Sequence, residues 1–147
     1  MTTVVYDHKQ GLIAIDSRIT SRDVIVSDEF DKCLSQDNEI WFFCGTVADS
    51  KHLMQLKHDD NPEVKPDSTA IVACDGEVKL VTFNGDHCSH ESLKYNFSIG
   101  SGANFAIAAL DFDCDVKSAL EYTAKKDPFT GGKIQVFDVN KMEFISE

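Results

Sequence analysis

Residues 12–16 predict a strand that carries three consecutive apolar side chains, Ile13, Ala14 and Ile15. Because successive side chains of a strand point to opposite faces of its sheet, both faces of this strand avoid water. We therefore expect it to lie inside a layered fold, with another layer packed on each side. A turn at Gln10-Gly11 joins it to a strand at residues 2–7, so the two segments are predicted to form a hairpin.

The other predicted elements come in blocks of one type. Asp75-Gly76 is a strong hairpin signal between two strand segments, and Asp37-Asn38 marks another tight turn. Of three predicted helices, the one over 103–111 is apolar almost all round and is expected to be buried. The predicted strands are 2–7, 12–16, 32–35, 39–44, 69–74, 77–83, 95–99, 133–139 and 141–145, and the predicted helices are 47–57, 103–111 and 115–125.

Grouped strands and two successive helices are typical of an α+β fold with antiparallel sheets, rather than of alternating βαβ units. Residues 58–68 are polar, contain two prolines and predict a loop. The length of 147 residues fits a single domain that spans 1–147.

The charge balance argues against several classes of partner. The chain has 14 Lys+Arg against 25 Asp+Glu, a net charge of −11, so nucleic acid and anionic membranes are not expected to bind it. Its apolar runs are far shorter than the roughly 20 residues of a membrane helix, and residues 1–30 lack the pattern of a signal peptide. The five cysteines are odd in number and widely spaced, which predicts reduced thiols and a cytoplasmic protein.

Thr2 is a candidate nucleophile. Cytosolic processing removes Met1 when a small residue follows it, and we expect that removal here, with no propeptide beyond Met1. An N-terminal threonine combines a hydroxyl with an amine whose pKa is about 7.7–8.0, so the amine can act as the base near pH 7. A chain that keeps Met1 has no free amine on Thr2 and is expected to be inactive. Because many proteins begin with Met-Thr, this signal needs support from other residues.

Asp16 and Lys32 supply that support if the fold brings them to Thr2. Taken alone, they predict a surface turn and an exposed lysine. Buried beside Thr2, the Lys32 ammonium would favour deprotonation of the hydroxyl and lower the pKa of the base. Asp16 would hold the lysine charged and oriented.

Six motifs, in this order, resemble the proteasome β-subunit family of N-terminal nucleophile hydrolases, which includes the peptidase of the bacterial ATP-dependent two-component protease. The motifs span nearly the whole chain and are Thr2-Thr3-Val4-Val5, residues 11–18, Lys32, residues 44–49, residues 99–102 and residues 126–132. The resemblance implies a four-layer αββα sandwich, in which two antiparallel sheets lie between helices. Where the family has two helices before the strand at 69–74, only one is predicted, so one helical layer should be abbreviated.

The resemblance also implies a threonine-type peptidase with Thr2 as nucleophile and its amine as base. It assigns Asp16 and Lys32 to the charged pair beside Thr2, and the backbone N–H of Gly45 to oxyanion binding. A supporting hydrogen-bond shell around the amine is implied for three more residues, Ser101, Asp127 and Thr130, the last at a position where the family usually has serine.

Four residues are implied in substrate binding. Ile19 and Thr20 fall where family members line the substrate channel, and Phe43 and Val47 fall near the specificity pocket. Two bulky apolar groups there suggest a shallow apolar pocket. The resemblance further implies a ring homo-oligomer that acts on a peptide or an unfolded protein, with an ATP-dependent unfoldase as a candidate partner. We expect neither a metal ion nor a cofactor.

Two alternatives to the peptidase stay open. One is a catalytically silent ring or binding subunit that keeps the fold and never exposes Thr2; the other is an N-terminal nucleophile amidase that acts on a small amide. The run Asp86–His90 contains metal-ligand residue types, but its spacing matches no tight zinc pattern and it predicts a polar loop. Gly100-Ser101-Gly102 is neither a P-loop nor a serine-hydrolase elbow.

Overall fold

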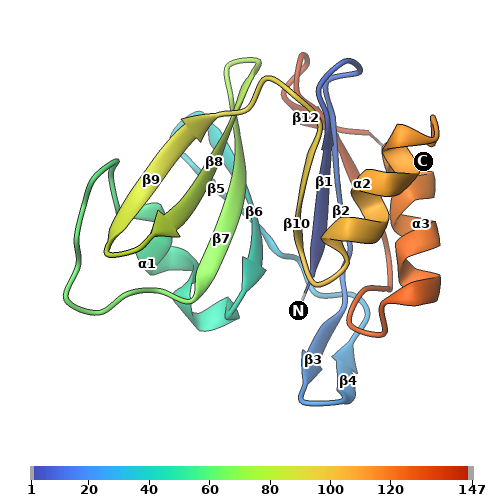
Figure 1. Ribbon diagram of the computed structural model, residues 1–147, viewed down its shortest axis with the longest axis horizontal. Helices are drawn as coiled ribbons and strands as arrows, with labels where there is room; N and C mark the ends of the chain where they lie inside the picture. Colours follow the sequence, from blue (N-terminus) through green and yellow to red (C-terminus); the bar gives the residue numbers. More distant parts are fainter. Residues whose placement is uncertain (1, 146–147) are drawn as a thin grey trace.

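The computed structural model describes residues 2–145 and contains two five-stranded antiparallel sheets, which face each other in Figure 1. The first sheet has the order β10 (Phe97–Gly100), β1 (Thr3–Asp7), β2 (Leu12–Ile15), β11 (Gln135–Asp138) and β12 (Glu143–Phe144). The second has the order β5 (Cys33–Gln36), β6 (Glu39–Gly45), β7 (Ser68–Cys74), β8 (Glu77–Asn84) and β9 (His87–Ser92).

Helices cover the outer face of each sheet unequally. α2 (Ala103–Asp111) and α3 (Val116–Lys126) lie side by side on the first sheet. Within residues 2–145, the second sheet has only the five-residue α1 (Ser50–Met54), which follows a 3₁₀ turn at Val47–Asp49. The four-layer αββα sandwich with one abbreviated helical layer is therefore confirmed (Figure 1).

The alternation of side chains along β1 and β2 explains the layering. Val4 and Ile15 are register partners and point into the core between the two sheets, where Phe42 and Ile71 of the second sheet meet them. Their neighbours Val5 and Ala14 are partners on the opposite face and pack against α2 and α3. The expectation that the strand at 12–16 is buried on both faces is confirmed for β2, because Ala14 and Ile15, which point to opposite faces, are both inaccessible to solvent.

The outer face of the second sheet has its own apolar cluster. Trp41 and Phe43 stack with ring centroids 5.8 Å apart, and Leu53 of α1 is buried against the same cluster. The predicted helix over 47–57 is too long, because the α-helical part ends at Met54. No helix in residues 2–145 has both the length and the apolar character needed to cross a membrane.

The structure differs from the sequence predictions at three further places. The run Asp86–His90 is no polar loop: His87–Ser92 form strand β9, which pairs with β8 and buries Cys88. A short hairpin of β3 (Ile19–Ser21) and β4 (Val24–Ser27) was missed and extends from the sandwich near the N-terminus (Figure 1). Helix α2 is present where predicted, but it is not buried all round, since Phe105 on its outer side is exposed.

Candidate active site

Thr2 lies directly before β1, at one end of the sandwich, and is only 3% exposed. Its carbonyl accepts a hydrogen bond of 2.9 Å from the Ser101 N–H. Gly100, the register partner of Thr3, has a φ of +102°, and a Cβ there would lie 1.7 Å from the Thr2 oxygen. Only glycine lets β10 approach this closely, so the segment 100–101 holds the Thr2 backbone in place.

Lys32 extends from the residue before β5 and reaches Thr2. Its ammonium donates to Thr2 Oγ1 at 2.5 Å, to Asp16 Oδ1 at 2.8 Å and to the Arg18 carbonyl at 2.7 Å. An ammonium has three donors, so these three acceptors satisfy it completely. The side chain is 4% exposed, which means that Lys32 is neither a surface lysine nor free to rotate.

Asp16 follows β2 and is held from two sides. Its Oδ1 accepts from the Thr3 N–H at 3.2 Å, and its Oδ2 accepts from the Gly131 N–H at 2.9 Å. Burial raises the pKa of the Asp16 carboxyl, although the Lys32 ammonium acts in the opposite direction. Burial likewise lowers the pKa of Lys32, against the opposing effect of Asp16. Each group is thus the counter-ion that the other needs when both side chains are buried.

A second polar network lies on the other side of the Thr2-Thr3 segment. Asp127 Oδ2 accepts hydrogen bonds of 2.6 Å from both the Ser101 hydroxyl and the Thr130 hydroxyl. Thr130 also lies 2.7 Å from Thr3 Oγ1. Although burial acts in the opposite direction, hydrogen bonds from Ser101 and Thr130 lower the pKa of Asp127. All three residues of the predicted supporting shell therefore belong to one hydrogen-bonded chain that ends beside Thr2.

Gly45 is the last residue of β6 and lines the same cavities as Thr2. Its φ is +101°, and a Cβ would lie 2.6 Å from the Asp67 carbonyl oxygen. The close packing of Asp67 and Ser68 therefore requires glycine at this position, a reason that the sequence did not reveal.

Two cavities open next to Thr2. One of about 290 Å³ has mainly apolar walls that include Phe30, Leu34, Phe43 and Val47. The other is a groove of about 700 Å³ between the β3 hairpin, with Ile19 and Thr20, and the segment 45–48. Phe43 thus lines the first cavity, Ile19 and Thr20 line the second, and Val47 lines both.

Several residues at the site were not found from the sequence. Phe30 and Leu34 line the apolar cavity, and Arg18 forms a two-pronged ion pair with Asp28, at 2.7 and 3.1 Å, while it donates to the Pro128 carbonyl at 3.0 Å. From the sequence, Arg18 was recognised only as part of the motif at residues 11–18. Its ion pair was missed, because nothing in the local sequence indicates a partner ten residues away. Among residues 2–145, no group of three or more His, Cys, Asp or Glu side chains is arranged to hold a metal ion.

No protein-family model and no curated protein matches the chain. Among solved structures, it is similar to BPH of Thiobacillus denitrificans, determined in complex with epoxomicin, at 14% identity and a TM-score of 0.70, over 92% of this chain and 97% of that chain. It is also similar to the eukaryotic HslV from Trypanosoma brucei, at 19% identity and a TM-score of 0.67, with the same coverage of each chain. At such identities the similarity establishes the fold. This protein therefore shares the fold of BPH and of HslV.

Proposed function

We propose that this protein is a threonine peptidase, which cleaves peptide bonds with the Thr2 hydroxyl after removal of Met1. The observation that carries the proposal is the 2.5 Å contact between Lys32 Nζ and Thr2 Oγ1, with Lys32 itself held by Asp16. A buried lysine costs folding free energy through desolvation, and a purely structural position has no need of one. A hydroxyl nucleophile does need one, because a nearby ammonium favours its deprotonation.

In the proposed reaction, Thr2 Oγ1 attacks the carbonyl carbon of the substrate peptide bond. The free amine of Thr2 takes the hydroxyl proton and then gives it to the leaving amine, as the C–N bond breaks and an ester to Thr2 forms. Water, activated by the same amine, hydrolyses the ester and releases the second product. Met1 would block both proton transfers, because an amide nitrogen has no available lone pair.

The surrounding residues have separate roles in this proposal. Lys32 stabilises the developing alkoxide of Thr2, and Asp16 orients Lys32. Gly45 supplies its N–H to the oxyanion that forms on the substrate carbonyl. The amine is oriented by the second polar network, which consists of the Asp127 carboxylate and the hydroxyls of Ser101 and Thr130.

The cavities favour a peptide over a small amide as the substrate. The apolar cavity of about 290 Å³ would accept one large apolar side chain, such as leucine or phenylalanine, next to the cleaved bond. The groove along Ile19 and Thr20, of about 700 Å³, offers room for further residues of an extended chain. A small amide would leave this groove empty.

We further propose that the protein works in the cytoplasm as a ring homo-oligomer, with an ATP-dependent unfoldase as the source of unfolded substrate. These points rest on the resemblance of the sequence to the proteasome β-subunit family. Native mass spectrometry of the full chain, alone and with cell extract supplemented with ATP, tests the assembly and the partner.

The direct test uses the electrophile epoxomicin, which the Thiobacillus protein binds. The chain is produced in two forms: one that retains Met1, and one that begins at Thr2 after cleavage of an N-terminal fusion. We expect an adduct on Thr2, located by peptide mass spectrometry, only in the form that begins at Thr2. Thr2→Ala should abolish labelling and turnover of peptides, whereas Thr2→Ser should retain some of both.

The outcomes distinguish the alternatives. Equal labelling of both forms, or an adduct on a cysteine such as Cys44 in the cavity wall, would contradict the mechanism. A form that begins at Thr2 and labels nowhere would indicate a catalytically silent subunit. Labelling of Thr2 combined with turnover of small amides, but not of peptides, would indicate an amidase.

A further inference from the structure

Asp67, the residue directly before β7, holds the end of β6 through both its backbone and its side chain. Its carbonyl accepts from the Thr46 N–H at 2.7 Å, and its Oδ2 accepts from the Thr46 hydroxyl at 3.0 Å. Its own N–H donates to Asp49 Oδ2 at 2.8 Å, and the Asp49 N–H donates to the Thr46 carbonyl at 3.1 Å. We call these four hydrogen bonds the Asp67 clamp. They close a ring of contacts directly after Gly45.

The strand register shows where the Gly45 N–H points. In an antiparallel pair, the N–H groups of successive residues point alternately toward the neighbouring strand and away from it. The Thr46 N–H points toward the β7 side, whereas the Phe43 N–H donates to the Lys32 carbonyl at 3.2 Å on the opposite side. Gly45 follows Phe43 by two residues, so its N–H points away from β7. That side also holds Thr2, whose hydroxyl the Lys32 ammonium contacts.

Gly45 depends on the clamp for its position. The residue is exposed in the groove and has a φ of +101°, and glycine has no side chain that could restrict its backbone. The Asp67 carbonyl oxygen lies 2.6 Å from the place of a Gly45 Cβ, so Asp67 packs directly against this backbone. A donor at a reaction centre must be held to within about 0.5 Å to be effective. A contact on Thr46, the next residue, supplies such a restraint.

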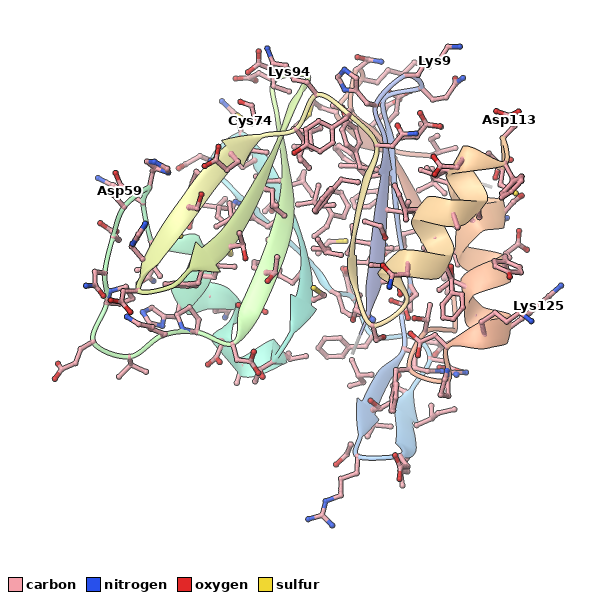
Figure 2. All side chains as sticks on the ribbon, viewed as in Figure 1. Lys9, Asp59, Cys74, Lys94, Asp113 and Lys125 are labelled. Atoms are coloured by element: carbon pink, nitrogen blue, oxygen red, sulfur yellow. The ribbon has the colours of Figure 1, made fainter. Side chains whose placement is uncertain are left out.

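The loop that leads to Asp67 is itself attached to the second sheet. Residues 55–67 connect α1 to β7, and Asp59 marks their outer side in Figure 2. The Asp59 N–H donates to a backbone carbonyl of β9 at 2.8 Å. Lys65, two residues before Asp67, donates to the Asp86 carbonyl at 2.8 Å. The loop is thus fixed at two separate points, and Asp67 is held from outside the active site.

We propose that Asp67 is a positioning residue for the peptidase reaction, which sets the direction of the Gly45 N–H through the Asp67 clamp. This inference rests on the proposed function, in which the Gly45 N–H stabilises the oxyanion. Asp67 acts through Thr46 rather than on the reacting atoms. Because Asp67 also lines the groove of about 700 Å³, the experiments must separate positioning from substrate binding.

The first test uses peptide turnover by the chain that begins at Thr2. Asp67→Ala removes the side-chain contact and keeps the backbone contacts, so kcat should fall roughly tenfold, less than the ~10²–10³-fold for loss of a whole oxyanion donor. KM should stay unchanged. Asp67→Asn keeps an acceptor oxygen and should recover most of kcat. Glu63→Ala is the matched control, because it removes an exposed carboxylate from the same loop, and its kcat should equal that of the wild type.

Two results of the first test would overturn the positioning role while the wild type remains active. One is an unchanged kcat for Asp67→Ala, or a change confined to KM. The other is a kcat for Asp67→Asn as low as that for Asp67→Ala, since the amide oxygen can accept the same hydrogen bond. Circular dichroism checks that each variant is folded. A wild-type chain that begins at Thr2 and neither cleaves peptides nor reacts with epoxomicin would overturn the proposed function together with this inference.

The second test measures the oxyanion contact with two inhibitors, a peptide aldehyde that ends in leucinal and the matching alcohol that ends in leucinol. Thr2 Oγ1 adds to the aldehyde carbon, the Thr2 amine takes the hydroxyl proton, and the former carbonyl oxygen becomes an oxyanion. The alcohol binds without forming this adduct. Asp67→Ala should weaken inhibition by the aldehyde by about the same factor as it lowers kcat/KM, and leave inhibition by the alcohol unchanged. Equal weakening of both inhibitors would assign Asp67 to substrate binding and overturn the proposal.

Discussion

Two buried aspartates, Asp16 and Asp127, lie on opposite sides of the Thr2-Thr3 segment and differ in what surrounds them. Asp16 is paired with the Lys32 ammonium and two backbone N–H groups, and burial raises the pKa of its carboxyl. Asp127 forms no ion pair within residues 2–145 and accepts from the hydroxyls of Ser101 and Thr130, whose hydrogen bonds lower its pKa against the effect of burial. The same side chain is thus part of a charged pair at one position and of a hydroxyl network at the other.

The difference indicates which network is closer to the chemistry. The Asp16 side contacts the proposed nucleophile through one charged group, so it acts on the charge of the Thr2 oxygen. The Asp127 side reaches Thr2 only through Ser101 and Thr3, so it acts on the position of the backbone. The effects of substitutions should therefore differ between the two sides, both in their magnitude and in the property that they change.

The largest effect is expected for Lys32→Ala. Loss of the ammonium next to Thr2 Oγ1 should lower kcat/KM by ~10²–10³-fold, the usual value for one electrostatic contact at a transition state. Asp16 would also lose its counter-ion, which should lower the free energy of unfolding by about 3–5 kcal/mol. Peptide turnover and urea unfolding measure the two effects.

A second substitution separates activity from stability in that variant. Adding Asp16→Asn to Lys32→Ala removes the uncompensated carboxylate and should restore part of the stability, while turnover stays low. Recovery of turnover in the double variant would show that Lys32 acts only as the partner of Asp16.

Asp127→Ala should have a smaller effect on turnover. It leaves the hydroxyls of Ser101 and Thr130 without their acceptor, which should cost about 1–3 kcal/mol of unfolding free energy. We expect kcat/KM to fall by roughly tenfold, equivalent to about 1.4 kcal/mol. Thr130→Ser keeps the donor and serves as the matched control, with activity near that of the wild type. A loss as large as that of Lys32→Ala would contradict the division between the two networks.

The pH dependence of stability should have opposite signs for the two aspartates. The folded pKa of Asp127 is lowered, so its stabilisation is present above about pH 3.9, the unfolded value, and is lost as the pH falls through the folded value. The pKa of Asp16 is raised in the folded state. Its contribution to the free energy of unfolding therefore decreases as the pH rises from about 3.9, the unfolded value, through the folded value. Urea midpoints of the wild type, Asp16→Asn and Asp127→Asn between pH 3 and 7 measure both slopes. Slopes of the same sign would refute this assignment.

The smallest effect is expected for Asp28→Ala, which removes the ion pair with Arg18 outside both networks. The Asp28 side chain is 42% exposed, and such pairs contribute about 0–1 kcal/mol. Thermal unfolding and turnover should both stay close to the wild-type values. A large loss of turnover would show that Arg18, whose carbonyl accepts from Lys32, needs Asp28 to hold its position.

Much of the fold could be predicted because its signals are local. The turn at Asp75-Gly76 has positive φ values of 50° and 83°, as a tight hairpin requires, and both residue types tolerate them. Strand β9 was missed because a run of Asp, His, Cys and Ser has no apolar alternation. Its place in the sheet comes from pairing with β8, from His87 opposite Asn84 to Ser92 opposite Lys79.

The sequence by itself determined the residue types of the site, the order of the strands and helices other than β3, β4 and β9, and the apolar character of both faces of β2. Tertiary structure decided which polar residues are buried and what they contact. The Lys32 ammonium contacts the candidate nucleophile only because Asp16, Arg18 and Thr2 come together around it in the fold. Asp16 is itself held by the N–H of Gly131, which is 115 positions away in the sequence. The physical reason is that turns and periodicity depend on neighbours along the chain, whereas desolvation and pKa depend on neighbours in space.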